Sequence, residues 1–157
     1  MIRRTLLAAL VSTALAAAAA PGIDRARVRR SNGRIEAIVA SIEAAARSLA
    51  GDEAVPAGRP GARRTVSVSL PGAAWDEAEV DAISLASPAE RTLTLRYRIA
   101  GGGRRSRTIR TPESVTTADD EPIELDGDGP HELALSLRGD QRRRRMVVER
   151  VSDARSR

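Results

Sequence analysis

The sequence predicts an α+β protein in which an N-terminal helix, hydrophobic and then amphipathic, precedes an antiparallel β-sheet of about five to seven strands. Two hydrophobic patterns predict this class. Up to Ala50 the apolar residues follow helical spacing, whereas after residue 63 they alternate with polar residues at a period of two. A stretch rich in Pro and Gly separates the two patterns and indicates a boundary between helix and sheet.

Residues 1–22 are predicted to be a hydrophobic leader or membrane anchor. Arg3 and Arg4 precede an uncharged run of sixteen residues from Thr5 to Ala20, and Pro21 follows. A helix of that length, at about 1.5 Å per residue, is shorter than a hydrocarbon core about 30 Å thick, so it spans only with help from its flanks. The small residues before Pro21 also fit a signal-peptidase site. Cleavage and retention therefore both remain open.

The positive charge of the chain lies next to this leader. The net charge is +5, and the segment up to Ala50 holds eight Arg and three acidic residues, whereas the remainder holds eighteen of each. Arginines beside an apolar segment are attracted to anionic lipid head groups. Those predicted to contact a membrane surface are Arg25, Arg27, Arg29, Arg30 and Arg34. Since the rest of the chain is neutral overall, nucleic acid is not an expected partner.

The side of the membrane is contested. More arginines follow the leader than precede it, and the positive-inside rule taken alone would place the C-terminal domain in the cytoplasm. A marginal leader in front of a β-rich domain favours export instead. The expected localisation is a membrane-anchored protein with an exported C-terminal domain, or a secreted protein after cleavage of the leader.

Residues 23–50 are predicted to form an amphipathic helix. Its apolar residues recur every seven positions, at Val28, Ile35, Ile42 and Leu49. The repeat lasts only about three heptads, so we expect this face to pack on the protein's own sheet rather than in a coiled coil. Ser31, Asn32 and Gly33 interrupt the pattern and have the composition of a second helix start, which leaves a two-piece helix open.

Residues 51–63 are predicted to be a linker, 64–152 an antiparallel β domain and 153–157 a polar tail. Clear alternation marks three strands, at 65–70, 92–99 and 132–138. Shorter apolar runs mark four weaker strands, at 80–85, 105–110, 123–125 and 145–151. Turn residues at 100–103 and 126–130 predict two hairpins.

No catalytic residue, cofactor site or metal site is predicted. The chain has no Cys and no Lys, which excludes disulfides, thiolate chemistry and Schiff-base lysines. The acidic stretch at 119–132 contains only a fragment of a calcium loop. His131, without a supporting motif, is interpreted as a surface residue at a strand edge. The basic block 142–145 is expected to pair with the acidic stretch or to contact another subunit.

Four arginines flank the predicted glycine turn at 100–103. Arg96 and Arg98 precede the turn, and Arg105 and Arg107 follow it. We expect all four to project from the wet face of the sheet, where outward charge opposes edge-to-edge aggregation. They are the residues predicted to bind a partner.

The layout resembles that of type IV pilins and pseudopilins, and is similar to that of small archaeal envelope proteins associated with such machines. The resemblance rests on a short basic start, an apolar helix containing Pro21, an amphipathic continuation and a terminal antiparallel sheet. It implies that the apolar helix packs in a filament or a membrane-embedded assembly with other pilus or secretion subunits. The chain departs from the pattern because no Gly precedes the apolar run and no Glu lies near its start.

The expected function is therefore non-catalytic: an envelope protein that acts as a pilin-like assembly component of a pilus or secretion system. The alternative is a secreted binding domain that recognises a polyanion or a protein through an arginine-lined sheet face.

Overall fold

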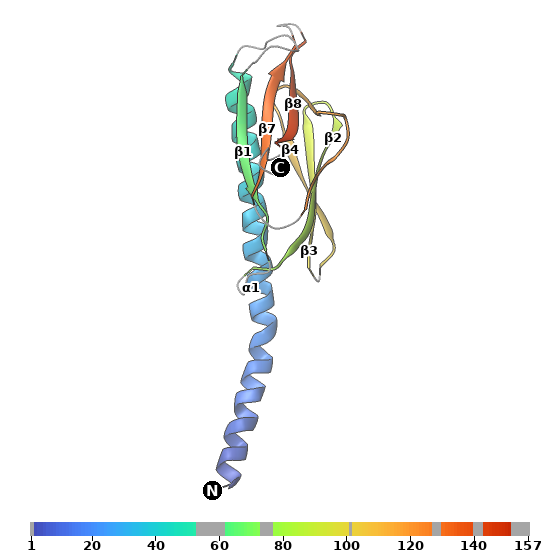
Figure 1. The fold of residues 1–157 in the computed structure, drawn as a ribbon. Coiled ribbons are helices and arrows are strands. Elements are labelled where there is room, and N and C mark those ends of the chain that lie inside the picture. The colour runs from blue at the N-terminus through green and yellow to red at the C-terminus, as the bar shows by residue number, and fades with distance from the viewer. Residues whose placement is uncertain are drawn as a thin grey trace, which may run out of the picture.

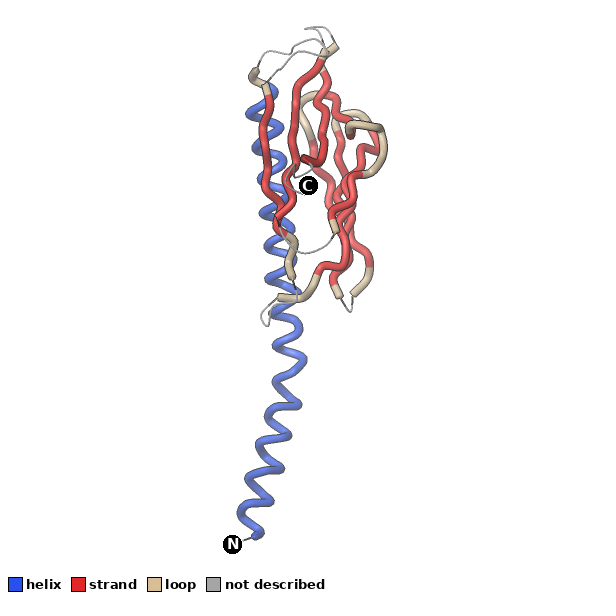
Figure 2. Tube along the Cα trace, in the orientation of Figure 1, coloured by secondary structure: helices blue, strands red, loops and turns tan. Residues whose placement is uncertain are grey.

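The computed structural model describes residues 2–52, 62–72, 77–100, 102–126, 130–139 and 143–151, with side chains from residue 22 onward. Within them, one long helix, α1 (Ile2–Ala50), lies along eight strands in two four-stranded sheets (Figures 1 and 2). The predicted α+β class is confirmed. The strands form two sheets, however, where the sequence predicted one sheet of about five to seven.

The first sheet has the strand order β1-β7-β8-β5 and the second β4-β3-β2-β6. Every described pairing is antiparallel except that of β5 with β8, which is parallel. The strands are β1 (Arg63–Ser69), β2 (Val80–Ala89), β3 (Thr92–Ile99), β4 (Arg104–Arg110), β5 (Ser114–Thr117), β6 (Ile123–Leu125), β7 (Pro130–Arg138) and β8 (Arg145–Val151).

One predicted hairpin is confirmed and the other is wrong. Strands β3 and β4, before and after the predicted turn, pair as antiparallel neighbours from Thr92 with Arg110 to Arg98 with Arg104. Strands β6 and β7, before and after the segment 126–130, do not form a hairpin, because β6 pairs with β2 while β7 pairs with β1 and β8. Alternation along a strand shows which face is buried but does not identify the neighbouring strand.

The C-terminal half of α1 closes the core between the sheets. Ile35, Ile42 and Leu49 are fully buried, which confirms the seven-residue spacing. The helix contacts β1 and β7 of one sheet and β3 and β4 of the other, so it lies along the side where β1 and β4 are the edge strands (Figure 1). The sheets contribute an aliphatic interior that includes Val68, Leu85, Leu95, Ile109, Leu133, Leu135 and Val148.

The helix is continuous, so the two-piece interpretation is wrong. The Ser31 hydroxyl lies 3.2 Å from the Arg27 carbonyl oxygen, and the Asn32 amide donates to the Val28 carbonyl oxygen at 2.9 Å. These are bonds to the carbonyl four residues earlier, which Ser and Asn make inside a helix rather than at its start. Both side chains also bind the β domain, as described below.

The N-terminal part of α1 projects away from both sheets (Figures 1 and 2). Residues 22–26 are exposed, and the polar contacts of the helix with the sheet domain begin at Arg27. We call residues 2–26 the stem. The side chains up to residue 21, which include most of the predicted leader 1–22, lie outside the described ones. Most of the linker 51–63 and the whole tail 153–157 also lie outside the described residues.

Within the described part of the chain, no helix combines the length and the apolar character that crossing a bilayer requires.

Candidate interaction surfaces

The arginines predicted to contact a membrane lie where the stem meets the sheet domain, and two of them bind Glu77. Arg27 donates through its Nε and Nη2 to the Glu77 carbonyl oxygen, at 3.3 and 3.1 Å. Arg34 forms an ion pair with the Glu77 carboxylate at 3.5 Å. Glu77 belongs to the segment before β2, so these two arginines fasten that segment to the helix. Their role at a membrane surface stays a prediction.

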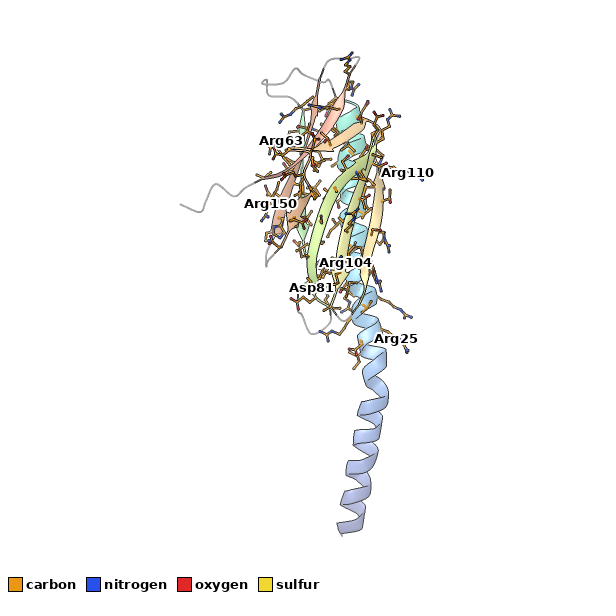
Figure 3. All side chains as sticks on the ribbon, turned by 90° about the vertical axis from the view of Figure 1, so that its right-hand side faces the viewer. Arg25, Arg63, Asp81, Arg104, Arg110 and Arg150 are labelled. Carbon is orange, nitrogen blue, oxygen red and sulfur yellow. The ribbon has the colours of Figure 1, made fainter. Side chains whose placement is uncertain are left out.

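The other three arginines of that set are Arg25, Arg29 and Arg30, and all are exposed. Arg30 has an interaction partner. Arg25 and Arg29 make no hydrogen bond or ion pair with any residue that the structure describes. Arg25 projects from the helix below the sheet domain (Figure 3). Arg25 and Arg29 are thus the members of the set with side chains available to an outside anion.

Ser31 and Asn32 form a polar joint between helix and sheets. The fully buried Ser31 hydroxyl accepts a hydrogen bond from the Ala78 amide at 2.9 Å and lies 2.7 Å from the Ala78 carbonyl oxygen. The side-chain oxygen of Asn32, Oδ1, accepts from the Tyr97 hydroxyl at 3.3 Å and from Arg105 at 3.0 Å. Ser31 and Asn32, whose residue types favour a helix start, therefore attach the helix to the sheet domain. Sequence reasoning missed this role.

The four arginines of the β3–β4 hairpin do not share one face, so that prediction is wrong. Arg105 and Arg107 lie opposite Tyr97 and Leu95 in the register, on the face that meets the helix. Arg107 binds the Glu36 carboxylate of α1, and this hydrogen bond raises the pKa of Arg107 above its ordinary value. Both arginines therefore contact the chain's own helix.

Arg96 and Arg98 lie on the opposite, outer face, together with Arg104, which sequence reasoning missed. The register places Arg98 beside Arg104 and Arg96 beside Ser106. Because side chains alternate along paired strands, the even-numbered residues of β3 and β4 share one face and the odd-numbered residues share the other. Once the turn between the two strands is assigned, the residue numbers alone place Arg104 on the same face as Arg96 and Arg98.

These three outer arginines surround a shallow hollow of about 620 Å³. Its lining also includes the small residues Ala82 and Ser84 of β2 and Ser106 of β4, together with Tyr97, Arg105 and Glu124. We call Arg96, Arg98 and Arg104, with this hollow, the arginine face. Arg104 lies at the end of the domain nearer the stem, whereas Arg110 lies at the far end (Figure 3).

Charge on the arginine face is only partly compensated. Arg98 forms an ion pair with Asp81 at 2.7 Å. Arg96 and Arg104 form no ion pair or hydrogen bond with any described residue, and both are exposed. The face therefore presents two free guanidinium groups next to a concave surface, which suits an anionic occupant.

The described carboxylates of the acidic stretch 119–132 do not converge on one site. Nowhere in the described ranges do three or more His, Asp or Glu residues lie close enough together to hold a metal ion, and Asp128 lies outside those ranges. Asp119, Asp120 and Glu121 form an exposed turn between β5 and β6. Asp126 instead pairs with Arg150 of the other sheet at 3.7 Å.

His131 is buried, so its interpretation as a surface residue is wrong. It is 8% exposed, and its Nδ1 lies 3.3 Å from Nη2 of Arg150. His131 has the same parity as Leu133 and Leu135, which face the core, so the alternation on β7 did contain this signal. Arg150 also donates to the Glu124 carbonyl oxygen at 3.1 Å and thereby ties β8 to β6 across the two sheets.

Arg144 of the basic block 142–145 binds the end of α1 and not the acidic stretch. Arg144 donates to the carbonyl oxygens of Ala50 and Asp52, at 2.7 and 3.2 Å, and lies 3.7 Å from the Glu113 carboxylate. A cation at this position satisfies the free carbonyls and the negative pole of the α1 C-terminus. The side chain of Arg142 lies outside the described residues.

No curated protein and no solved structure matches this chain. The helix packed on β-sheets is a pilin-like architecture, but the family model that matches is not that of a pilin. It is the model of a domain of unknown function, and it covers residues 1–151. Because this match includes α1 and all eight described strands, the chain belongs to the DUF7311 family.

Proposed function

We propose that this protein is a non-catalytic envelope component whose stem enters a membrane or a bundle of helices from other subunits, while the sheet domain faces outward. The arrangement is that of a pilin-like subunit of a pilus or secretion system. The observation that carries the proposal is the stem, a long helical segment that extends beyond the domain to which it belongs (Figure 1).

The length and sequence of the stem support this role. The uncharged run within the stem, Thr5 to Ala20, is about 24 Å long as a helix, and its charged flanks bring the stem of residues 2–26 to about 37 Å, against a hydrocarbon core about 30 Å thick. The stem contains the uncharged run from Thr5 to Ala20, with arginines on both sides of it. Ile23, which follows this run, is 56% exposed although its side chain is large and apolar. An apolar helix with charged ends is suited to a bilayer or to a bundle of similar helices.

The way the domain is built also supports it. The apolar face of α1 from Ile35 to Leu49 completes the core of the two sheets. The described buried core residues begin at Ile35, beyond the stem. One helix can therefore serve its own domain with one half and an external environment with the other.

Fractionation of native cells, followed by intact mass and N-terminal sequencing, tests the proposal. We expect the chain in the membrane or filament fraction with its stem retained. A start near Thr5 would indicate processing of the pilin type. A mature protein that begins near Ala20 and is found in the soluble exported fraction would contradict the proposal, because the stem would have been removed.

The arginine face favours a second candidate function, a secreted domain that binds a polyanion or an acidic protein. Arg96 and Arg104 are available for such a ligand. This candidate predicts salt-sensitive retention of the cleaved protein on an anionic surface such as heparin. It also predicts that the mature chain lacks the stem, so the same sequencing experiment separates the two candidates.

A further inference from the structure

We propose that the arginine face binds the acidic turn, Asp119, Asp120 and Glu121, of a second copy of this chain. Copies would then join through two different surfaces. The inference rests on the proposed function, because it names a contact between the subunits of such an assembly.

The arginine face supplies the receptor surface. Arg96 and Arg104 are without ion pairs in the described part of the chain, and only Glu124 adds a negative charge to the lining of the hollow. Three residues of the lining, Ala82, Ser84 and Ser106, have small side chains, so a convex group can approach the guanidinium groups. Paired guanidinium and carboxylate groups form charge-assisted hydrogen bonds, which are stronger than neutral ones.

The acidic turn supplies a convex and preformed ligand. Its three side chains are exposed, and Asp119 and Glu121 have no ion pair among the described residues. The backbone there is fixed by hydrogen bonds from Ala118 to Val148, at 2.9 Å, and from Asp120 to Thr117, at 3.2 Å. The Thr116 hydroxyl also binds the Asp120 carboxylate. A turn already held in one conformation loses little entropy on binding.

Neither Arg96 nor Arg104 pairs with the acidic turn of its own chain. The turn ends at β6, where Ile123 is paired with Leu85 of β2. Arg96 and Arg104 lie on β3 and β4, two and three strands from β6 in the same sheet, or roughly 10 to 15 Å away. Two different patches that bind each other between copies make a heterologous interface, which propagates into a ring or a filament. This geometry suits a subunit of an extended assembly.

Cysteine cross-linking of the full chain tests the contact, because the natural sequence has no Cys. One tagged copy carries Ser106→Cys in the lining of the hollow, and a second, differently tagged copy carries Ala118→Cys beside the acidic turn. Co-expressed in native cells, the two copies should form a mixed disulfide dimer. A Ser41→Cys copy, altered on the exposed face of α1, is the control partner and should give background only. If Ser106→Cys copies cross-link mainly with each other, the contact is symmetric and the proposal is wrong.

Charge reversal in the same assay identifies the residues that carry the contact. Arg96→Glu/Arg104→Glu in one copy, or Asp119→Arg/Glu121→Arg in the other, should lower the mixed dimer about tenfold. Both changes together, one in each copy, should restore most of it, because the charges again match. Arg110→Glu/Arg145→Glu and Glu79→Arg/Glu132→Arg make the same charge changes elsewhere and should have little effect. Failure of the paired reversal to restore the dimer, in variants with the parent circular dichroism spectrum, would overturn the proposal.

Two further outcomes distinguish this contact from lipid binding and from the proposed membrane assembly. If no mixed dimer forms and Arg96→Glu/Arg104→Glu instead lowers binding of the full chain to phosphatidylserine vesicles, the arginine face binds lipid and the proposal is wrong. Fractionation of the same cells tests the proposed function independently. A mixed dimer in a soluble fraction would contradict only the membrane assembly, and a membrane-bound chain without the mixed dimer would contradict only this contact.

Discussion

The two halves of the long helix differ in what surrounds them. From Ser31 to Leu49, one face of α1 is buried by both sheets and the joint residues bond to three separate segments. From residue 22 to residue 26 every described side chain is exposed. A single unbroken helix therefore contains a half that is part of a folded domain and a half that the domain leaves uncovered. The difference teaches that the stability of the domain and the role of the stem can be tested separately.

The largest effect should come from the apolar face of the packed half. Ile42 is fully buried at the centre of that face, so Ile42→Ala should lower the free energy of unfolding by about 2 to 5 kcal/mol. Ile23→Ala, in the stem, should change it by less than about 0.5 kcal/mol, because Ile23 is 56% exposed. Urea unfolding of the full chain in mild detergent, followed by circular dichroism, measures both. Similar losses in the two variants would show that the domain does depend on the stem.

The second largest effect on the free energy of unfolding should come from Ser31, in the polar joint between helix and sheets. Ser31→Ala removes the buried hydroxyl that bonds the part-buried amide and carbonyl groups of Ala78, which should cost about 1 to 3 kcal/mol. Ser41 makes only the bond to the carbonyl four residues earlier, that of Ala37, and is exposed, so Ser41→Ala is the matched control and should be nearly neutral. Urea unfolding of both variants, followed by circular dichroism, measures the two losses of stability. Equal effects would mean that Ser31 acts on the helix alone and does not fasten the domain to it.

Much of this fold could be predicted from the sequence, and the failures share a physical cause. Spacing identified the buried face of the helix and the strands around Val66, Leu95 and Leu135, because periodicity reports which side of an element is buried. It could not show that β6 and β7 belong to different sheets, since pairing partners are chosen by the whole fold. Strand β5 was missed because only one of its four residues, Val115, is apolar.

The candidate surface was predicted in part. The sequence singled out the arginines around the glycine turn, and their role in binding a partner stays a prediction, but all four were assigned to one face without following the register across the turn. Ser31 and Asn32 were interpreted from local preferences, which favour helix caps, whereas tertiary partners decide their role here. Arg144 could not be assigned to the helix end, because 92 residues separate it from Asp52.

A smaller effect on stability should come from replacing the helical glycine in each half of α1. A methyl group added at Gly33 or at Gly22 would meet no atom within 4 Å, and both residues are helical. Gly33→Ala should therefore raise the stability of the domain by about 0.5 to 1 kcal/mol, because Ala favours the helix that the core requires. Gly22→Ala should increase helix content without raising the unfolding midpoint of the domain. An equal gain in midpoint from both variants would mean that stem and domain unfold together.

The smallest effect should belong to the ion pairs that line the packed half. Arg107 and Glu36 are bonded but their side chains are 39% and 53% exposed, and such surface pairs contribute only about 0.2 to 1 kcal/mol. A double-mutant cycle with Arg107→Ala and Glu36→Ala should give a coupling energy in that range, and it should shrink in high salt. Arg96→Ala is the control from the other face of the same hairpin and should leave monomer stability unchanged. A coupling above about 2 kcal/mol would mean that charge, rather than the apolar stripe, distinguishes the packed half from the stem.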